Sequence, residues 1–160
     1  MTSRSRAGLL CALAGTVLAA CVNQSAPAGK QANPVTLIRF TRTGGLAASR
    51  AAGTVTFSAN HGYSDGETVP YRRELDPQEL KQLRADAEAA DFRTAQNALP
   101  LRGVPDAYQF EIAVVREDGT SRSLRFRENS LDRLKQVSPA AFRLADWVKQ
   151  EAGRIAEHRI

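Results

Sequence analysis

The placement of cysteine limits what this chain can fold into more than any other feature of its sequence. Both cysteines, Cys11 and Cys21, lie near the start of a chain of 160 residues. The long remainder therefore has no thiol for a disulfide, a zinc site or a nucleophile. Its two histidines, His61 and His158, are too far apart in the sequence to form a spaced ligand pair. Stability must come from a hydrophobic core, and the length with 42% hydrophobic residues predicts a single domain.

The N-terminal segment, residues 1–20, is organised like a bacterial export signal. Arg4 and Arg6 precede an apolar run that is too short to span a membrane comfortably. The run ends in the tetrapeptide LAAC, which resembles the lipobox of bacterial lipoproteins, where cleavage precedes the cysteine and its thiol is diacylated. The resemblance implies a lipid anchor on Cys21. Val22 follows where an aspartate would resemble an inner-membrane retention signal, so we expect the outer membrane, with the domain in the periplasm or at the cell surface.

Residues 21–33 are predicted to be the acylated cysteine and a flexible tether, because they are small and polar and lack periodicity. Loss of the two signal arginines leaves a net charge of +3 in place of +5. A basic chain outside the cytoplasm gives no reason to expect nucleic acid as a partner. The predicted organisation is a signal peptide over 1–20, a tether over 21–33 and a folded domain over 34–160.

Short segments of alternating or β-branched character predict the strands of the domain. In residues 35–43, Ile38 and Phe40 share one face. Pro70 confines its segment to an edge or a bulge. Residues 59–66 and 97–107 are expected to be loops. The predicted strands are 35–43, 53–58, 68–75 and two more, centred on Ile112 and Leu124.

Two helices are predicted from capping patterns. Asp76-Pro77 begins one that runs to about Asp91, and Ser138-Pro139 begins the last one. The last helix should bury a stripe of apolar residues at Ala141, Leu144, Ala145, Val148, Ala152 and Ile155. The sequence therefore predicts an α+β fold, an antiparallel sheet of four to five strands with two helices packed on one face.

The turn around Asp118-Gly119 decides the register of the last two strands. A two-residue loop would place Ile112 opposite Arg125, whereas a three-residue loop places Ile112 opposite Leu124 and keeps one face apolar. We therefore expect a bulged turn with Gly119 in the left-handed conformation.

Groups that could carry chemistry have simpler interpretations. The acid pairs Asp86/Glu88 and Asp132/Asp146 are expected on solvated helix faces, both histidines on the surface, and Trp147 in the core or at its edge. Alternation alone would place several arginines on one sheet face, at positions 39, 42, 122, 125 and 127. These features predict no enzyme, metal site, cofactor or small-molecule substrate.

Residues 44–53 form a connection far longer than a hairpin needs. Its large apolar residue is Leu46, among glycines and alanines. The connection is either a loose surface loop, with Leu46 folded back on the core, or an extended loop that offers Leu46 to the pocket of a partner.

Several short motifs occur in an order that resembles the emfourin family, over about residues 35–153. They are Arg42-Thr43-Gly44-Gly45-Leu46-Ala47, Asp106-Ala107-Tyr108-Gln109-Phe110-Glu111, Asp118-Gly119 and Leu144-Ala145-Asp146-Trp147, together with the capped helix at Asp76. Two differences from the family are Ala48, where glycine is common, and a longer segment before Asp76.

Emfourins are small inhibitors of thermolysin-type zinc metallopeptidases such as protealysin. The resemblance implies that this chain is a membrane-anchored inhibitor whose partner is such a peptidase. The implied inhibitory loop is Gly44, Gly45, Leu46, Ala47 and Ala48, inserted like a substrate. The alternative is a non-catalytic interaction or structural lipoprotein of the cell envelope.

Overall fold

A computed structural model of the protein describes residues 33–45, 50–100 and 106–158, which belong to one compact unit, Ala32–Ile160. Within these ranges no helix is long and apolar enough to cross a membrane. The elements in chain order are β1 (Val35–Thr43), β2 (Ala51–Phe57), β3 (Gly62–Gly66), β4 (Arg72–Glu74), α1 (Pro77–Ala89), α2 (Phe92–Ala98), β5 (Gln109–Arg116), β6 (Ser121–Arg127), a 3-10 turn at Glu128–Ser130, α3 (Leu131–Val137) and α4 (Pro139–Glu157).

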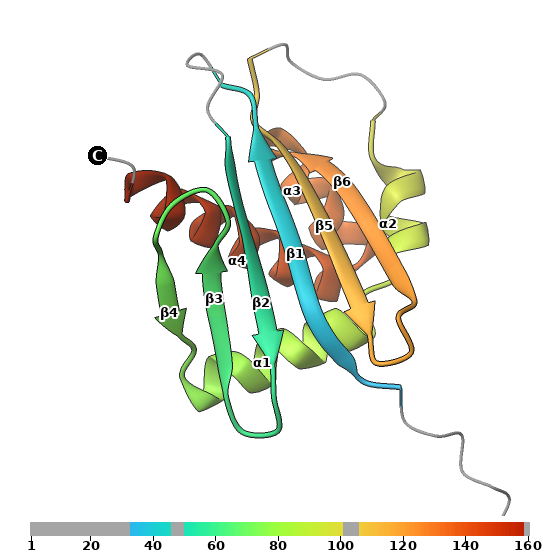
Figure 1. Cartoon of the computed structure of the whole chain (residues 1–160). Helices are drawn as coiled ribbons and strands as arrows, with labels where there is room; N and C mark the ends of the chain where they lie inside the picture. Colours follow the sequence, from blue (N-terminus) through green and yellow to red (C-terminus); the bar gives the residue numbers. More distant parts are fainter. Residues whose placement is uncertain (1–32, 46–49, 101–105, 159–160) are drawn as a thin grey trace, which may run out of the picture. The chain divides into compact units, whose positions relative to one another are not determined.

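The strands form one antiparallel sheet in the order β4-β3-β2-β1-β5-β6, with the first strand of the chain near its middle (Figure 1). In β1, Ile38 lies opposite Val55 of β2, and Phe40 lies opposite Ile112 of β5. All of these side chains are buried. The predicted α+β class is confirmed, although the described sheet has six strands and not four or five.

The hairpin of β5 and β6 has the predicted register. Ile112 faces Leu124, and Phe110 faces Phe126, whose ring stacks on it at 5.0 Å between centroids. Gly119 has a φ of 82°, as expected for the bulged turn. The prediction was correct because only this register keeps the large apolar residues of both strands on one face.

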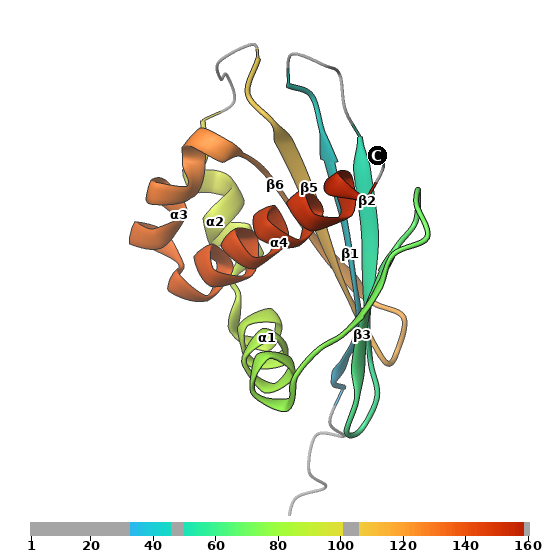
Figure 2. The ribbon, with the colours of Figure 1, turned by 90° about the vertical axis from the view of Figure 1, so that its left-hand side faces the viewer.

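Among the residues that the structure describes, all the helices lie on one face of the sheet (Figure 2). Both predicted helix starts are confirmed. The side chain of Asp76 accepts hydrogen bonds from the amides of Gln78 and Glu79, and Ser138 accepts one from the amide of Ala141. The predicted stripe of α4 is buried at Ala141, Leu144, Ala145, Val148, Ala152 and Ile155.

The prediction of a loop over residues 59–66 is wrong, because β3 occupies Gly62–Gly66 and pairs with β2. By alternation Gly62, Ser64 and Gly66 share the face toward the helices, and Gly62 and Ser64 are buried. A Cβ on Gly62 would collide with Leu80 of α1. The strand lacks an apolar alternation because the helix layer fills the space above it with its own side chains.

Other boundaries also differ from the predictions. Ala51 and Ala52, expected in the long connection, belong to β2 and are fully buried. Helices α2 and α3 were not predicted. Each has seven residues, too few for an apolar stripe to repeat, although Asp91 caps α2 through the amide of Thr94. Tertiary packing stabilises such short helices.

A partly buried ion-pair cluster fastens the edge strand β4 to the helices. Arg73 of β4 lies 2.8 Å from oxygens of both Glu79 of α1 and Glu151 of α4, and the Glu151 side chain is fully buried. Tyr71 Oη donates to Glu151 at 2.9 Å, and Trp147 Nε1 donates to Glu79 at 2.7 Å. Burial alone would raise the pKa of Glu151, but its hydrogen bonds from Arg73 and other donors outweigh burial and hold that pKa below its usual value.

Candidate functional site

The structure describes the first two residues of the predicted inhibitory loop, Gly44 and Gly45, directly after β1. Their φ angles are 97° and 76°, a conformation that glycine adopts without strain and that other residues rarely adopt. A Cβ on Gly44 would lie 3.2 Å from the carbonyl oxygen of Ala107. The chain therefore leaves the sheet through a close corner that needs both glycines, which we call the Gly44–Gly45 corner.

The corner lies at the end of a hairpin stem in the middle of the sheet. Arg42 and Ala51 are the last paired residues of β1 and β2. Arg50, just before β2, is exposed. The remaining predicted site residues lie outside the described ranges: Cys21, Leu46, Ala47 and Ala48.

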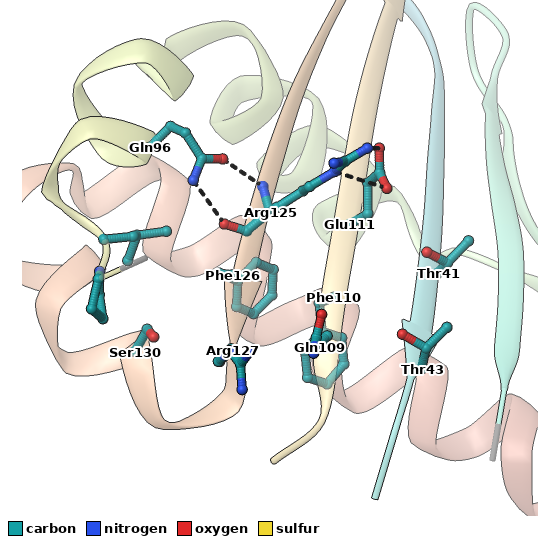
Figure 3. Close-up of a pocket in the computed structure, with 12 residues that line it drawn as sticks. Thr41, Thr43, Gln96, Gln109, Phe110, Glu111, Arg125, Phe126, Arg127 and Ser130 are labelled. Atoms are coloured by element: carbon teal, nitrogen blue, oxygen red, sulfur yellow. Dashed lines mark hydrogen bonds and ion pairs between the residues drawn. The ribbon is translucent and has the colours of Figure 1, made fainter. Parts of the chain in front are cut away.

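A pocket of about 430 Å³ lies where β1 and β6 end and β5 begins, next to α2 (Figure 3). Thr43, the residue before the Gly44–Gly45 corner, lines it. Its polar residues are Thr41, Thr43, Gln96, Gln109, Glu111, Arg125, Arg127 and Ser130, and its apolar residues are Leu99, Pro100, Phe110 and Phe126. Hydroxyl, amide and guanidinium groups in this arrangement provide a hydrogen-bonding surface beside the corner.

Within this pocket, Gln96 of α2 bonds to the backbone of β6. Its Nε2 donates to the carbonyl oxygen of Arg125 at 3.2 Å, and its Oε1 accepts from the amide of Arg125 at 2.8 Å (Figure 3). The side-chain amide thus replaces a neighbouring peptide group and closes the edge of β6 at this residue. The Arg125 guanidinium lies 3.2 Å from Glu111.

Both described histidines are on the surface. His61 is exposed beside Glu74, at 3.4 Å, and His158 is exposed at the end of α4. No three His, Cys, Asp or Glu side chains within residues 33–45, 50–100 and 106–158 gather closely enough to hold a metal ion.

The prediction that Asp86 and Glu88 lie on a solvated face is wrong. Asp86 is buried and lies 2.6 Å from Arg143 of α4, while Glu88 accepts from Val35 N and pairs with Arg116 at 2.9 Å. Both acids therefore join α1 to other elements. In the second predicted pair, Asp132 is exposed and Asp146 is half-buried.

The five arginines do not share one face of the sheet. Arg39 and Arg125 point to the helix-free face, as does Arg127 by the same alternation. Arg122 instead contacts backbone carbonyls of α1 and the ring of Phe92, and Arg42 stacks on Tyr108. The basic face suggested by alternation is therefore divided between the two sides of the sheet.

Trp147 is half-buried, and its ring lies edge-on to the ring of the core residue Phe40, as predicted.

Sequence reasoning missed Tyr108 and Glu151. Tyr108 belongs to the emfourin-like motif of residues 106–111, but nothing in the sequence places its ring beside Gly45. Glu151 lies within the apolar stripe of α4, between Val148 and Ile155, and this position indicates a buried carboxylate. Its partner Arg73 is distant in sequence and could not be identified from spacing.

Comparison of the chain with protein-family models, with curated proteins and with solved structures finds no match. The resemblance to emfourins and the Gly44–Gly45 corner are therefore the basis for a proposed function. The corner is the described part of the predicted site, and it fixes the position from which the predicted loop begins.

Proposed function

We propose that this chain is a lipid-anchored bacterial lipoprotein that inhibits thermolysin-type zinc metallopeptidases by inserting the loop Gly44 to Ala48 into the peptidase cleft. The inhibitor has no catalytic role, and Leu46 fills the apolar pocket that receives a residue after the scissile bond. The proposal rests on the resemblance to emfourins and on one structural observation, the packed glycine corner.

The Gly44–Gly45 corner supports the proposal because it starts the loop from a fixed position. It follows a central strand that is hydrogen-bonded on both sides, to β2 and to β5. A loop that begins from such a stem loses less conformational entropy on docking than a free peptide does. Two successive glycines also allow the close backbone approach that a peptidase cleft requires.

The position of β1 makes a lipid anchor compatible with an accessible loop. The tether joins the sheet at the start of β1, whereas Gly44 follows its end. A strand of nine residues at about 3.3 Å per residue spans about 30 Å. The loop therefore starts about one strand length from the point where the domain is attached.

An inhibition titration tests the proposal. Residues 34–160, which contain the complete described core, are titrated against thermolysin as wild type and as Leu46→Ala. Loss of the buried leucine removes about 1.5–3 kcal/mol, so the inhibition constant should rise roughly ten- to a hundredfold. Leu37→Ala is the matched control, because Leu37 is half-buried on the helix-free face of β1 and should leave inhibition unchanged.

The outcomes separate the alternatives. Failure of the wild type at micromolar concentration against several such peptidases would favour the non-catalytic envelope interaction lipoprotein. Inhibition that Leu46→Ala leaves intact would retain the peptidase as partner and reject Leu46 as the contact residue.

A further inference from the structure

Tyr108 lies where the Gly44–Gly45 corner, β5 and the chain beyond β6 meet. The register of β1 and β5 ends with Thr43 opposite Gln109, so Tyr108 stands beside Gly44. The backbone amide of Glu128, just after β6, donates to the carbonyl oxygen of Tyr108 at 3.1 Å. The ring is half-buried and packs against the core. The backbone and the ring of Tyr108 are thus both held in place by the domain.

The ring of Tyr108 takes up the space beside Gly45. A Cβ on Gly45 would lie 2.5 Å from Cε1, 2.7 Å from Cζ and 3.0 Å from Oη of Tyr108. The first two distances are shorter than real Cβ contacts, so with the ring in this position residue 45 has no room for a side chain. The ring therefore lies directly against the backbone of Gly45, the last described residue before the predicted loop continues.

Arg42 holds the same ring from β1. Its guanidinium carbon lies 4.6 Å from the ring centroid, within the range of a cation–π contact. Arg42 Nε is buried and has no hydrogen-bond partner among the described residues, and the guanidinium lies against the ring. Arg42 and Gly45, which are close in sequence, thus both lie against the ring of Tyr108.

We propose that Tyr108 is a positioning residue, which sets the direction in which the chain leaves β1 and so preorganises the inhibitory loop. This inference rests on the proposed function of that loop. Tyr108 acts through Gly45 and Arg42 and need not touch the peptidase. A loop held in its bound direction loses less entropy on docking, and removal of the ring should weaken inhibition without removing any contact made by Leu46.

The test compares three variants of the full chain in detergent. Tyr108→Phe retains the ring, and Tyr108→Leu removes it while keeping apolar volume over the core. Tyr63→Leu is the matched control, because Tyr63 of β3 is likewise half-buried and stacks with an arginine, Arg72, at 4.3 Å. Each variant is measured for inhibition of thermolysin and for hydrogen exchange of the peptide segment 41–50, relative to exchange in β6.

Tyr108→Leu should raise the inhibition constant by about tenfold, the factor for losing one ordering contact, and should speed exchange over residues 41–50. Tyr108→Phe should restore both values, and Tyr63→Leu should change neither. Unchanged exchange in Tyr108→Leu, or inhibition by Tyr108→Leu equal to that of an active wild type, would overturn the positioning role. The wild type could fail to inhibit thermolysin while hydrogen exchange over residues 41–50 is faster in Tyr108→Leu and normal in Tyr108→Phe. In that case the proposed function fails, but Tyr108 still positions the corner.

Discussion

Replacement of Arg73 by methionine should destabilise the domain far more than loss of an ordinary surface ion pair. The guanidinium of Arg73 lies 2.8 Å from both Glu79 and Glu151, whose side chains are 21% and 0% exposed. Removing one partner of a buried ion pair costs about 3–5 kcal/mol, because an uncompensated charge remains in the protein. Glu151 keeps its bonds from Tyr71 and Arg154, so we expect a loss at the lower end, about 3 kcal/mol.

The same substitution at an exposed pair provides the control. Arg125 and Glu111 lie 3.2 Å apart, but their side chains are 75% and 42% exposed. Exposed pairs contribute about 0.2–1 kcal/mol, so Arg125→Met should cost less than 1 kcal/mol. Urea denaturation of both variants and the wild type at neutral pH measures the difference in unfolding free energy.

At acid pH, the difference in unfolding free energy between wild type and Arg73→Met should become smaller. Hydrogen bonding to Arg73 holds the pKa of Glu79 below its usual value, and hydrogen bonds outweigh burial to do the same for the pKa of Glu151. The stabilisation is therefore present at neutral pH and is lost as the pH falls through these lowered pKa values. In the variant, burial of Glu151 persists without Arg73, so its pKa should rise. The reasoning is refuted if Arg73→Met is no less stable than Arg125→Met, or if the difference in unfolding free energy between wild type and Arg73→Met grows in acid.

Three further predictions concern the anchor, the core and the turns. Cys21→Ser should move the protein from the detergent-extracted membrane fraction to the soluble fraction, and an unchanged distribution would contradict the lipid anchor. Chelator and reductant should leave the melting temperature of residues 34–160 unchanged, since that part of the sequence has no cysteine and no spaced histidine pair. Gly119→Ala should lose about 1 kcal/mol of unfolding free energy from its φ of 82°, whereas Gly153→Ala, within α4, should gain about 0.5–1 kcal/mol. Nothing lies within 4 Å of a Cβ at either glycine, so urea denaturation of the two variants compares backbone conformation alone, and equal effects would contradict the prediction.

The sequence by itself determined the features that depend on neighbouring residues. The capping residues Asp76 and Ser138 located the starts of α1 and α4, and alternation located β1, β5 and β6. The register of β5 and β6 followed from pairing large apolar residues across a three-residue turn at Gly119. Such signals are local, since a cap or a turn involves atoms only a few residues apart.

Only the tertiary structure decided the features that depend on distant residues. The strand β3 pairs with β2 and has Leu80 of α1 packed over Gly62, and the charge of Glu151 is tolerated because β4 brings Arg73 to α4. The same holds at the candidate site. Its glycines were evident in the sequence, but their left-handed conformation and the ring of Tyr108 that limits it depend on the pairing of β1 with β5. Periodicity shows which side chains are buried, whereas the partner that each one meets is fixed only when the chain has folded.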